Sequence, residues 1–83
     1  MRLRYFAWVR ERAGLAEEEV ELPADVATVA ELIAWLRTRG PEFDHAFAAP
    51  AAIRAAIDMS HVEHSAAVAG AREIAFFPPV TGG

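Results

Sequence analysis

Apolar and polar residues alternate along the first positions of the chain. One set of alternating positions is apolar: Leu3, Tyr5, Ala7 and Val9. The other set holds arginines together with Phe6 and Trp8. A period of two predicts a β-strand over residues 2–9, with the first set facing the core. Phe6 and Trp8 would then lie on the opposite face, which is unusual for a face in contact with water alone.

A second, weaker alternation follows a charged turn over residues 10–14. It covers residues 17–22, with Val20 and Leu22 facing inward and Pro23 ending the strand. We expect this strand to pair with the first as a hairpin and to lie at a sheet edge. Its four glutamates leave two interpretations open. They form a docking surface for a basic partner, or they are a solvated edge that blocks association with other strands.

The helical period appears next, over residues 29–39. Thr28 is a good N-cap, Glu31 completes a capping box, and Gly40 followed by Pro41 ends the helix. The buried stripe is expected to comprise Val29, Leu32, Ile33 and Leu36, with Trp35 in the core or at its margin. A short helical turn over residues 42–48 would place Phe43 and Phe47 on one side.

The remaining apolar segments are short. They predict strands over residues 53–58, with Ala55 and Ile57 inward, over 61–62, and over 72–77 after a turn at Gly70. The order hairpin, helix, strands is typical of an α+β protein with the β-grasp fold, a mixed sheet with one main helix packed across one face. In that topology the first and last strands form a central parallel pair. Ala75 and Phe77 would then share the outer sheet face with Phe6 and Trp8.

The chain ends in a segment that suits neither helix nor strand. We divide the sequence into a β-grasp domain, residues 1–77, and a flexible C-terminal tail, residues 78–83, which reads Pro78, Pro79, Val80, Thr81, Gly82 and Gly83. Proline lacks the N–H that a β-ladder needs, and glycine has no side chain, so the tail is slender. Fully extended, it spans roughly 20 Å, long enough to enter another protein's active site. The reactive group at its tip is the α-carboxylate of Gly83.

Composition narrows the function classes. The 83 residues contain no cysteine, which excludes disulfides, thiolate metal sites and a cysteine nucleophile. The net charge of −4 argues against nucleic acid and favours a basic partner surface. We find neither an apolar run of the roughly 20 residues that span a membrane nor a secretion signal, and we expect a soluble, cytoplasmic protein without a membrane partner. All eight basic residues are arginines, so no side chain offers an amine for acylation.

Polar residues outside the tail give weaker indications. His61, Glu63 and His64 suggest a metal site, but without cysteine the set is not convincing, and we expect no bound metal. His61 is instead expected on the outer sheet face near Phe77, as part of a partner surface. Arg10 would lie at the edge of that surface, where it either pairs with a partner carboxylate or stays solvated.

Two stretches resemble a known family. The end of the chain, residues 76–83 (FFPPVTGG), and the start, residues 5–10 together with Glu11 (YFAWVRE), are similar to the small subunit of molybdopterin synthase, the ubiquitin-like sulfur carrier of molybdenum cofactor biosynthesis. The resemblance covers the whole chain in layout and is specific mainly in these stretches. It implies a reactive Gly83. The expected strand pairing separately gives the partner surface of Phe6, Trp8, Arg10, His61 and Phe77.

The resemblance also implies a reaction cycle. An adenylyltransferase similar to ubiquitin-activating enzymes would adenylate Gly83 with ATP, and a sulfur donor would displace AMP to leave a thiocarboxylate. The large subunit, in a heterotetramer with two of each chain, would use that sulfur on cyclic pyranopterin monophosphate. The small subunit itself would be non-catalytic and bind no cofactor. Two alternatives remain open: a sulfur carrier for thiamin synthesis, and a ubiquitin-like protein modifier or interaction domain.

Overall fold

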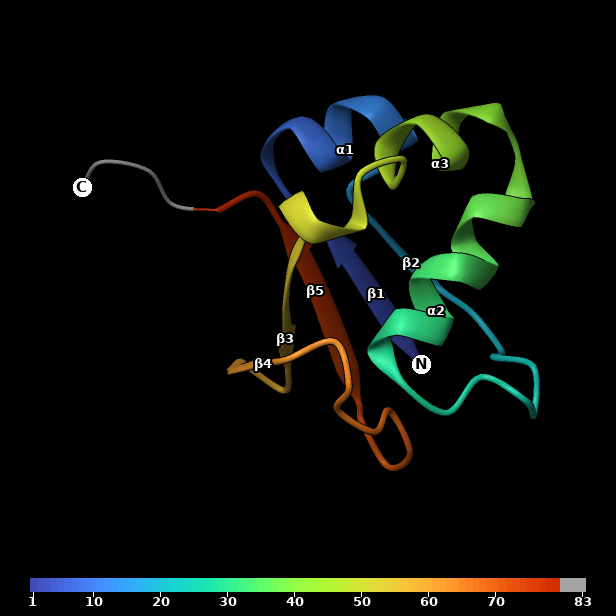
Figure 1. The fold of residues 1–83 in the computed structure, drawn as a ribbon, viewed down its shortest axis with the longest axis vertical. Coiled ribbons are helices and arrows are strands. Elements are labelled where there is room, and N and C mark those ends of the chain that lie inside the picture. Colours follow the sequence, from blue (N-terminus) through green and yellow to red (C-terminus); the bar gives the residue numbers. More distant parts are fainter. Residues whose placement is uncertain (80–83) are drawn as a thin grey trace.

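Five strands form one mixed β-sheet within residues 1–79, the part of the chain that the computed structural model describes (Figure 1). The strands are β1 (Arg2–Tyr5), β2 (Glu17–Glu19), β3 (Arg54–Ile57), β4 (Ser60–Val62) and β5 (Glu73–Phe77). The helices are α1 (Ala7–Ala13), α2 (Val29–Leu36) and α3 (Pro41–Ala46), with short 3₁₀ turns at Arg37–Arg39 and Pro50–Ala52. The strand order is β2-β1-β5-β3-β4.

The first and last strands form the centre of the sheet. They run parallel in a register that pairs Arg2 with Glu73 and Tyr5 with Phe76. On either side the neighbours β2 and β3 run antiparallel to this pair. The predicted central parallel pair is therefore confirmed, and with it the β-grasp arrangement of a hairpin side, a crossing helix and further strands.

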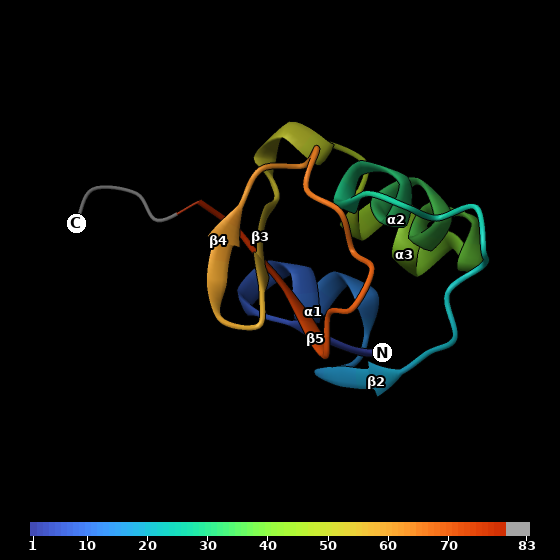
Figure 2. The ribbon, with the colours of Figure 1, turned by 90° about the horizontal axis from the view of Figure 1, so that it is seen from below.

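Helix α2 begins where its capping box predicts. The backbone N–H of Glu31 donates to Oγ1 of Thr28 over 3.2 Å, and the N–H of Thr28 donates to Oε1 of Glu31 over 3.0 Å. The buried stripe consists of Val29, Leu32, Ile33 and Leu36, as expected. Figure 2 shows that α2 and α3 lie together on one side of the sheet. Within residues 1–79, no helix covers the other side of the sheet.

The inward side of the central strands carries the aromatic core. Tyr5 and Phe76 are 1% and 0% exposed, and their rings stack with centroids 6.2 Å apart. The ring of Phe47 packs edge-on against the ring of Phe76, with the ring centroids 5.2 Å apart. Leu3 and Ile74 face the same way and are fully buried. The predicted register of both strands is confirmed at these positions, so the alternate positions of β5 must face outward.

The prediction of a strand over residues 2–9 is wrong beyond Tyr5. Phe6 is still extended, but Ala7 takes a φ of 52° and the chain then continues as α1. Val9 is buried as expected, yet from a helix, where it shares a face with Ala13 one turn later. Alternation over so few residues fits a helical stripe as well as a strand, and the backbone reversal at Ala7 decides between them.

Smaller corrections concern the segments around the main helix. β2 stops at Glu19, before the predicted end at residue 22, although Val20 and Leu22 do pack against the core. Pro50–Ala52, just before β3, form a 3₁₀ turn. The turn at Gly70 is confirmed, with a φ of 80° that suits glycine. No helix within residues 1–79 is long and apolar enough to cross a membrane.

A two-residue turn joins β3 to β4 at the end of the sheet opposite the tail. Asp58 and Met59 both take positive φ values, 47° and 72°. Oδ1 of Asp58 accepts hydrogen bonds from the backbone N–H groups of Arg72 and Glu73, each 3.0 Å long. Asp58 therefore ties this hairpin to the start of β5, whereas the side chain of Met59 is 89% exposed and occupies a conformation that favours glycine.

Replacing Met59 by glycine should stabilise the protein. Removing the Cβ relieves a left-handed strain of about 1–2 kcal/mol, partly offset by the greater freedom of glycine in the unfolded chain, so we expect a net gain of about 0.5–1 kcal/mol. Urea denaturation measures this difference. Met59→Ala is the control, because it removes the thioether but keeps the Cβ; an equal gain in both variants would contradict the backbone explanation.

Candidate functional site

The outer side of β5 carries Ala75 and Phe77, because Ile74 and Phe76 face the core. The sheet register places Arg4 beside Ala75 on β1, and Ala56 beside it on β3. Across the hairpin, His61 of β4 is the partner of Ala56. Ala56 and Ala75 therefore form a small apolar strip on the outer face, between Arg4 and His61.

Aromatic rings surround this apolar strip. The backbone N–H of Phe6 donates to the carbonyl oxygen of Phe76 over 3.0 Å, which holds Phe6 at the end of β1, and its side chain is 38% exposed. The guanidinium of Arg4 lies 5.0 Å from the centre of the Phe6 ring. The rings of His61 and Phe77 are 5.2 Å apart. We call the following set the tail-root face: Phe6, Arg54, Ala56, His61, Ala75 and Phe77.

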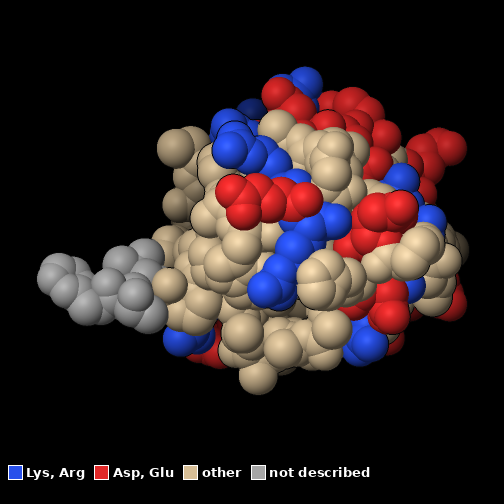
Figure 3. All heavy atoms as spheres, turned by 90° about the horizontal axis from the view of Figure 1, so that it is seen from above, with Lys and Arg blue, Asp and Glu red and all other residues tan. Residues whose placement is uncertain are grey.

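The first two residues of the predicted tail continue from the end of β5. Pro78 and Pro79 directly follow Phe77, at the end of the sheet where α1 lies (Figure 1). Viewed from that end, uncharged surface borders the root of the tail (Figure 3). A protein that receives the tail must therefore contact this uncharged surface. Val80, Thr81, Gly82 and Gly83, which the sequence singles out, lie outside the described residues.

Two predicted members of the partner surface are not on the sheet. Trp8 and Arg10 belong to α1, because the chain turns at Ala7. Trp8 packs against the margin of the core, and the guanidinium of Arg12 lies 4.3 Å from the centre of its ring. The placement of Trp8 on the outer sheet face was therefore wrong, whereas Phe6, His61 and Phe77 do belong to that face. Arg10, expected at the edge of the partner surface, is exposed on α1, and its role there stays a prediction.

Sequence reasoning missed two residues of the tail-root face, Arg54 and Ala56. Arg54 is the register partner of Phe77, and Ala56 that of Ala75. The signal was present in β3: with Ala55 predicted inward, the residues on either side of it had to point outward. What the sequence did not reveal is that β3 lies next to β5.

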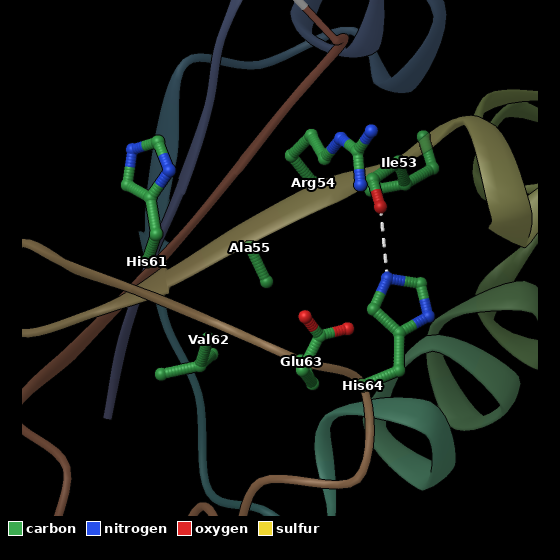
Figure 4. Close-up of a pocket in the computed structure, with 7 residues that line it drawn as sticks. All are labelled: Ile53, Arg54, Ala55, His61, Val62, Glu63 and His64. Atoms are coloured by element: carbon green, nitrogen blue, oxygen red, sulfur yellow. Dashed lines mark hydrogen bonds between the residues drawn. The ribbon is translucent and has the colours of Figure 1, made fainter.

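A pocket of about 280 Å³ lies beside the tail-root face, between β3, β4 and the segment that follows β4. Figure 4 shows the ring of His61 beyond the crossing of β3 and β4, the ring of His64 beside Ile53, and the carboxylate of Glu63 between the two strands. The imidazole Nε2 of His64 lies 2.8 Å from the carbonyl oxygen of Ile53. His61 and His64 therefore do not converge on a common point, and no group of three possible metal ligands occurs in residues 1–79.

The glutamates of β2 are engaged within the protein. The guanidinium of Arg2 lies 3.4 Å from Glu17 and 3.1 Å from Glu19. The guanidinium of Arg39 donates two hydrogen bonds to Glu18, of 2.6 and 2.9 Å, and the hydroxyl of Tyr5 donates a third of 2.7 Å. β2 therefore fastens the sheet edge to β1 and to the 3₁₀ turn that follows α2. Because these glutamates already have partners within the protein, this arrangement speaks against the interpretation of the run as a docking surface.

The contacts of Glu18 change its own pKa and that of Tyr5. Partial burial acts to raise the pKa of the Glu18 carboxyl, but the hydrogen bonds from Arg39 and Tyr5 and the charge of Arg39 outweigh it and lower that pKa below its usual range. Burial, and then the hydrogen bond to Glu18, raise the pKa of the Tyr5 phenol above its ordinary value. Tyr5 therefore stays protonated and able to donate at neutral pH.

The lowered pKa predicts an acid-dependent contribution to stability. Because Glu18 has a lower pKa in the folded chain than the value of about 4.3 expected when unfolded, its contribution is present above that value and is lost as the pH falls through the folded pKa. Glu18→Gln should therefore lower the free energy of unfolding at neutral pH and much less in acid. Urea denaturation across the acid range measures both.

The control for this experiment is Glu21→Gln. Glu21 is an exposed carboxylate just beyond β2 for which the described residues provide no ion pair. Its substitution should change stability little at any pH. A loss in Glu18→Gln that is the same at neutral and acid pH would contradict the electrostatic explanation.

The fold and the face define a class of protein, a ubiquitin-like β-grasp domain whose last central strand leads into a C-terminal tail. Residues 3–83 match the ThiS family, and the chain belongs to that family. The match includes the tail as far as Gly83. No match was found among curated proteins.

Solved structures agree in fold over the whole chain. SAMP1 from Haloferax volcanii is 27% identical, with a TM-score of 0.72 over 100% of this chain and 98% of that one. A Pyrococcus furiosus protein, provisionally assigned as subunit 1 of the molybdopterin converting factor, is 28% identical, with a TM-score of 0.73 over 95% of each chain. The chain is thus a ubiquitin-like member of the sulfur-carrier and modifier class.

Proposed function

We propose that this chain is the sulfur carrier of molybdenum cofactor biosynthesis, the small subunit of molybdopterin synthase. The observation that carries the proposal is the continuity of β5 with the tail: the central strand ends at Phe77, beside exposed aromatic rings, and leads directly into Pro78 and Pro79. The sequence then ends in Gly82 and Gly83. The resemblance of residues 76–83 to that family and the likeness to the P. furiosus protein support the choice of pathway.

The reaction starts at the carboxylate of Gly83. An oxygen of this carboxylate attacks the α-phosphate of ATP, pyrophosphate leaves, and the carboxyl carbon becomes part of a mixed anhydride with AMP. A donor of sulfur at the sulfide level then attacks that carbon, and AMP departs with the bridging oxygen. The product is a thiocarboxylate, which supplies sulfur to cyclic pyranopterin monophosphate in the large subunit.

This chain contributes shape and binding to the cycle, and the partners contribute the catalytic groups. Gly82 and Gly83 present the reacting carbon without side chains, which allows a narrow channel to close around it. Pro78 and Pro79 restrict the stem, so less conformational entropy is lost when the tail is threaded. The tail-root face supplies an apolar surface for the receiving protein. In the complete synthase we expect two carriers bound to a dimer of the large subunit.

The test is intact-mass measurement. The full chain is incubated with ATP, sulfide and the ubiquitin-activating-like adenylyltransferase of the same organism. We expect the mass to rise by the exchange of one oxygen for one sulfur, and this change should be absent without ATP. Addition of the large subunit and cyclic pyranopterin monophosphate should then return the original mass and produce the dithiolene. An unchanged mass in the complete mixture would refute the proposal.

A second candidate function is protein modification. It is favoured by the likeness to SAMP1, the small archaeal modifier protein 1 of H. volcanii, which extends over the full length of this chain. A modifier would form an amide between Gly83 and an amine of a target, which appears as adducts of higher mass in the same assay when acceptor proteins are added. Because the sequence contains no lysine, such adducts could not grow into lysine-linked chains.

The thiamin pathway uses the same first steps and is separated from the molybdenum pathway by the acceptor. If the thiocarboxylated chain delivers sulfur to thiazole synthesis and not to cyclic pyranopterin monophosphate, the assignment changes from molybdopterin to thiamin. The ThiS-family match by itself is compatible with either pathway.

A further inference from the structure

The charges on the outer sheet face are unevenly distributed. Far from the tail, the register aligns Glu19, Arg2 and Glu73 in one row. Arg2 lies within ion-pair distance of Glu17 and Glu19, and Arg4 lies 3.8 Å from Glu73. The acidic and basic groups at this end of the face therefore neutralise one another.

The end of the face next to the tail is different. Arg54 is the register partner of Phe77, the last residue before the tail, and its side chain is exposed. Within residues 1–79, no carboxylate lies within 4.0 Å of its guanidinium. Glu63 lines the same pocket as Arg54, with its carboxylate between β3 and β4 (Figure 4), but it does not come within this distance of the guanidinium. The surface beside the tail thus combines apolar rings with an unpaired positive charge.

A protein that holds the tail in its active site must cover this charge. The six residues from Pro78 to Gly83 span roughly 20 Å at most, so the receiving surface has to lie against the tail-root face. A guanidinium that loses its water without gaining an anion is costly, whereas a carboxylate can accept two parallel hydrogen bonds from it. Arginine in such a position is a frequent source of binding energy.

We propose that the tail-root face binds an apolar surface that presents a carboxylate to Arg54, and that this surface belongs to the enzyme that adenylates Gly83. The proposal rests on the proposed function. It reverses the expectation from the net charge of −4, which favours a basic partner, because the glutamates of β2 are already paired with Arg2 and Arg39. The local charge at the docking face, and not the net charge, then determines which partner fits.

The experiment measures adenylation with the full chain and the adenylyltransferase of the same organism, by ATP–pyrophosphate exchange at increasing carrier concentration. Arg54→Glu places a carboxylate against the partner's carboxylate and should raise the KM for the carrier about tenfold or more, with kcat unchanged because the tail is intact. Arg54→Gln should raise the KM less. Raising the salt concentration should increase the KM of the unmodified chain and change that of Arg54→Gln little.

Arg72→Glu is the matched control. Arg72 is exposed and immediately precedes β5, at the end of the strand opposite the tail. The substitution Arg72→Glu changes the net charge by the same amount as Arg54→Glu. The KM of the adenylyltransferase for the Arg72→Glu chain should stay within about twofold of that for the unmodified chain. Thermal melts establish that each variant is folded, and Arg54→Gln, which introduces no charge, carries the test if Arg54→Glu does not fold.

Each outcome decides the proposal. An unchanged or lowered KM in the Arg54 variants overturns it, and so does an equal rise in Arg54→Glu and Arg72→Glu, which would indicate net charge alone. If the unmodified chain supports no exchange while the enzyme is active on another carrier, the proposed function itself fails, and the docking proposal fails with it.

Discussion

Phe76→Ala should destabilise the protein by about 3–5 kcal/mol, as expected for truncation of a fully buried phenylalanine. The ring of Phe76 is 0% exposed and contacts both Tyr5 and Phe47. Its removal leaves a cavity where the central parallel strands meet the helical layer. The free energy of unfolding of a small domain is about 5–15 kcal/mol, so this substitution would remove a large part of it. Urea denaturation monitored by circular dichroism measures the loss.

The neighbouring Phe77 provides the contrast within the same strand. Because its side chain faces outward, Phe77→Asp should cost the isolated chain about 1 kcal/mol or less. Binding to the adenylyltransferase or the large subunit should nevertheless weaken by several kcal/mol, since an unpaired carboxylate would be buried against an apolar surface. Calorimetric titration of both partners tests this. If Phe77→Asp unfolds the chain, or binds both partners as tightly as before, the tail-root face is not the docking surface.

Deletion of Gly83 should abolish thiocarboxylate formation and leave the fold intact. The reacting carbon must reach a fixed point in the adenylation site, and shortening the chain by one residue withdraws it by roughly 3 Å. The effect on the free energy of unfolding should stay within about 0.5 kcal/mol, as for surface changes away from packed features. Intact mass after incubation with ATP, adenylyltransferase and sulfide gives the first result, and a thermal melt gives the second.

A chain extended by one residue after Gly83 is the matched control for this deletion. It keeps both glycines but moves the terminal carboxylate outward by a similar distance. We expect no thiocarboxylate from either variant. Its formation on the extended chain without prior trimming would show that the position of the carboxylate is not what the reaction requires.

The sequence by itself determined the parts of the fold that depend on neighbouring residues. The pattern of β5 assigned Ile74 and Phe76 to the core and Phe77 to the outside, and the pair Thr28 and Glu31 marked the start of α2. These features follow from backbone geometry and from contacts only a few residues apart. The expectation of a slender tail over residues 78–83 stays a prediction, because Val80 to Gly83 lie outside the described residues.

The start of α1 was not determined in this way. Alternation through Val9 fits a strand, whereas Val9 and Ala13 fit one face of a helix, and neither pattern is long enough to exclude the other. The positive φ of Ala7 turns the chain away from the sheet and moves Trp8 and Arg10 with it. Packing of α1 against α3 decides in favour of the helix, and this contact joins segments that are about thirty residues apart.

Only the tertiary structure decided which neighbours the charged side chains have. Glu18 receives its hydrogen bonds from Arg39, 21 positions away in the chain, and Arg54 lies beside Phe77 because β3 pairs with β5. The sequence provided the number of charges but not their partners. Ion pairs and outer-face neighbours depend on which strands lie side by side, and strand pairing is a property of the whole core, since each strand is held by residues distant in sequence.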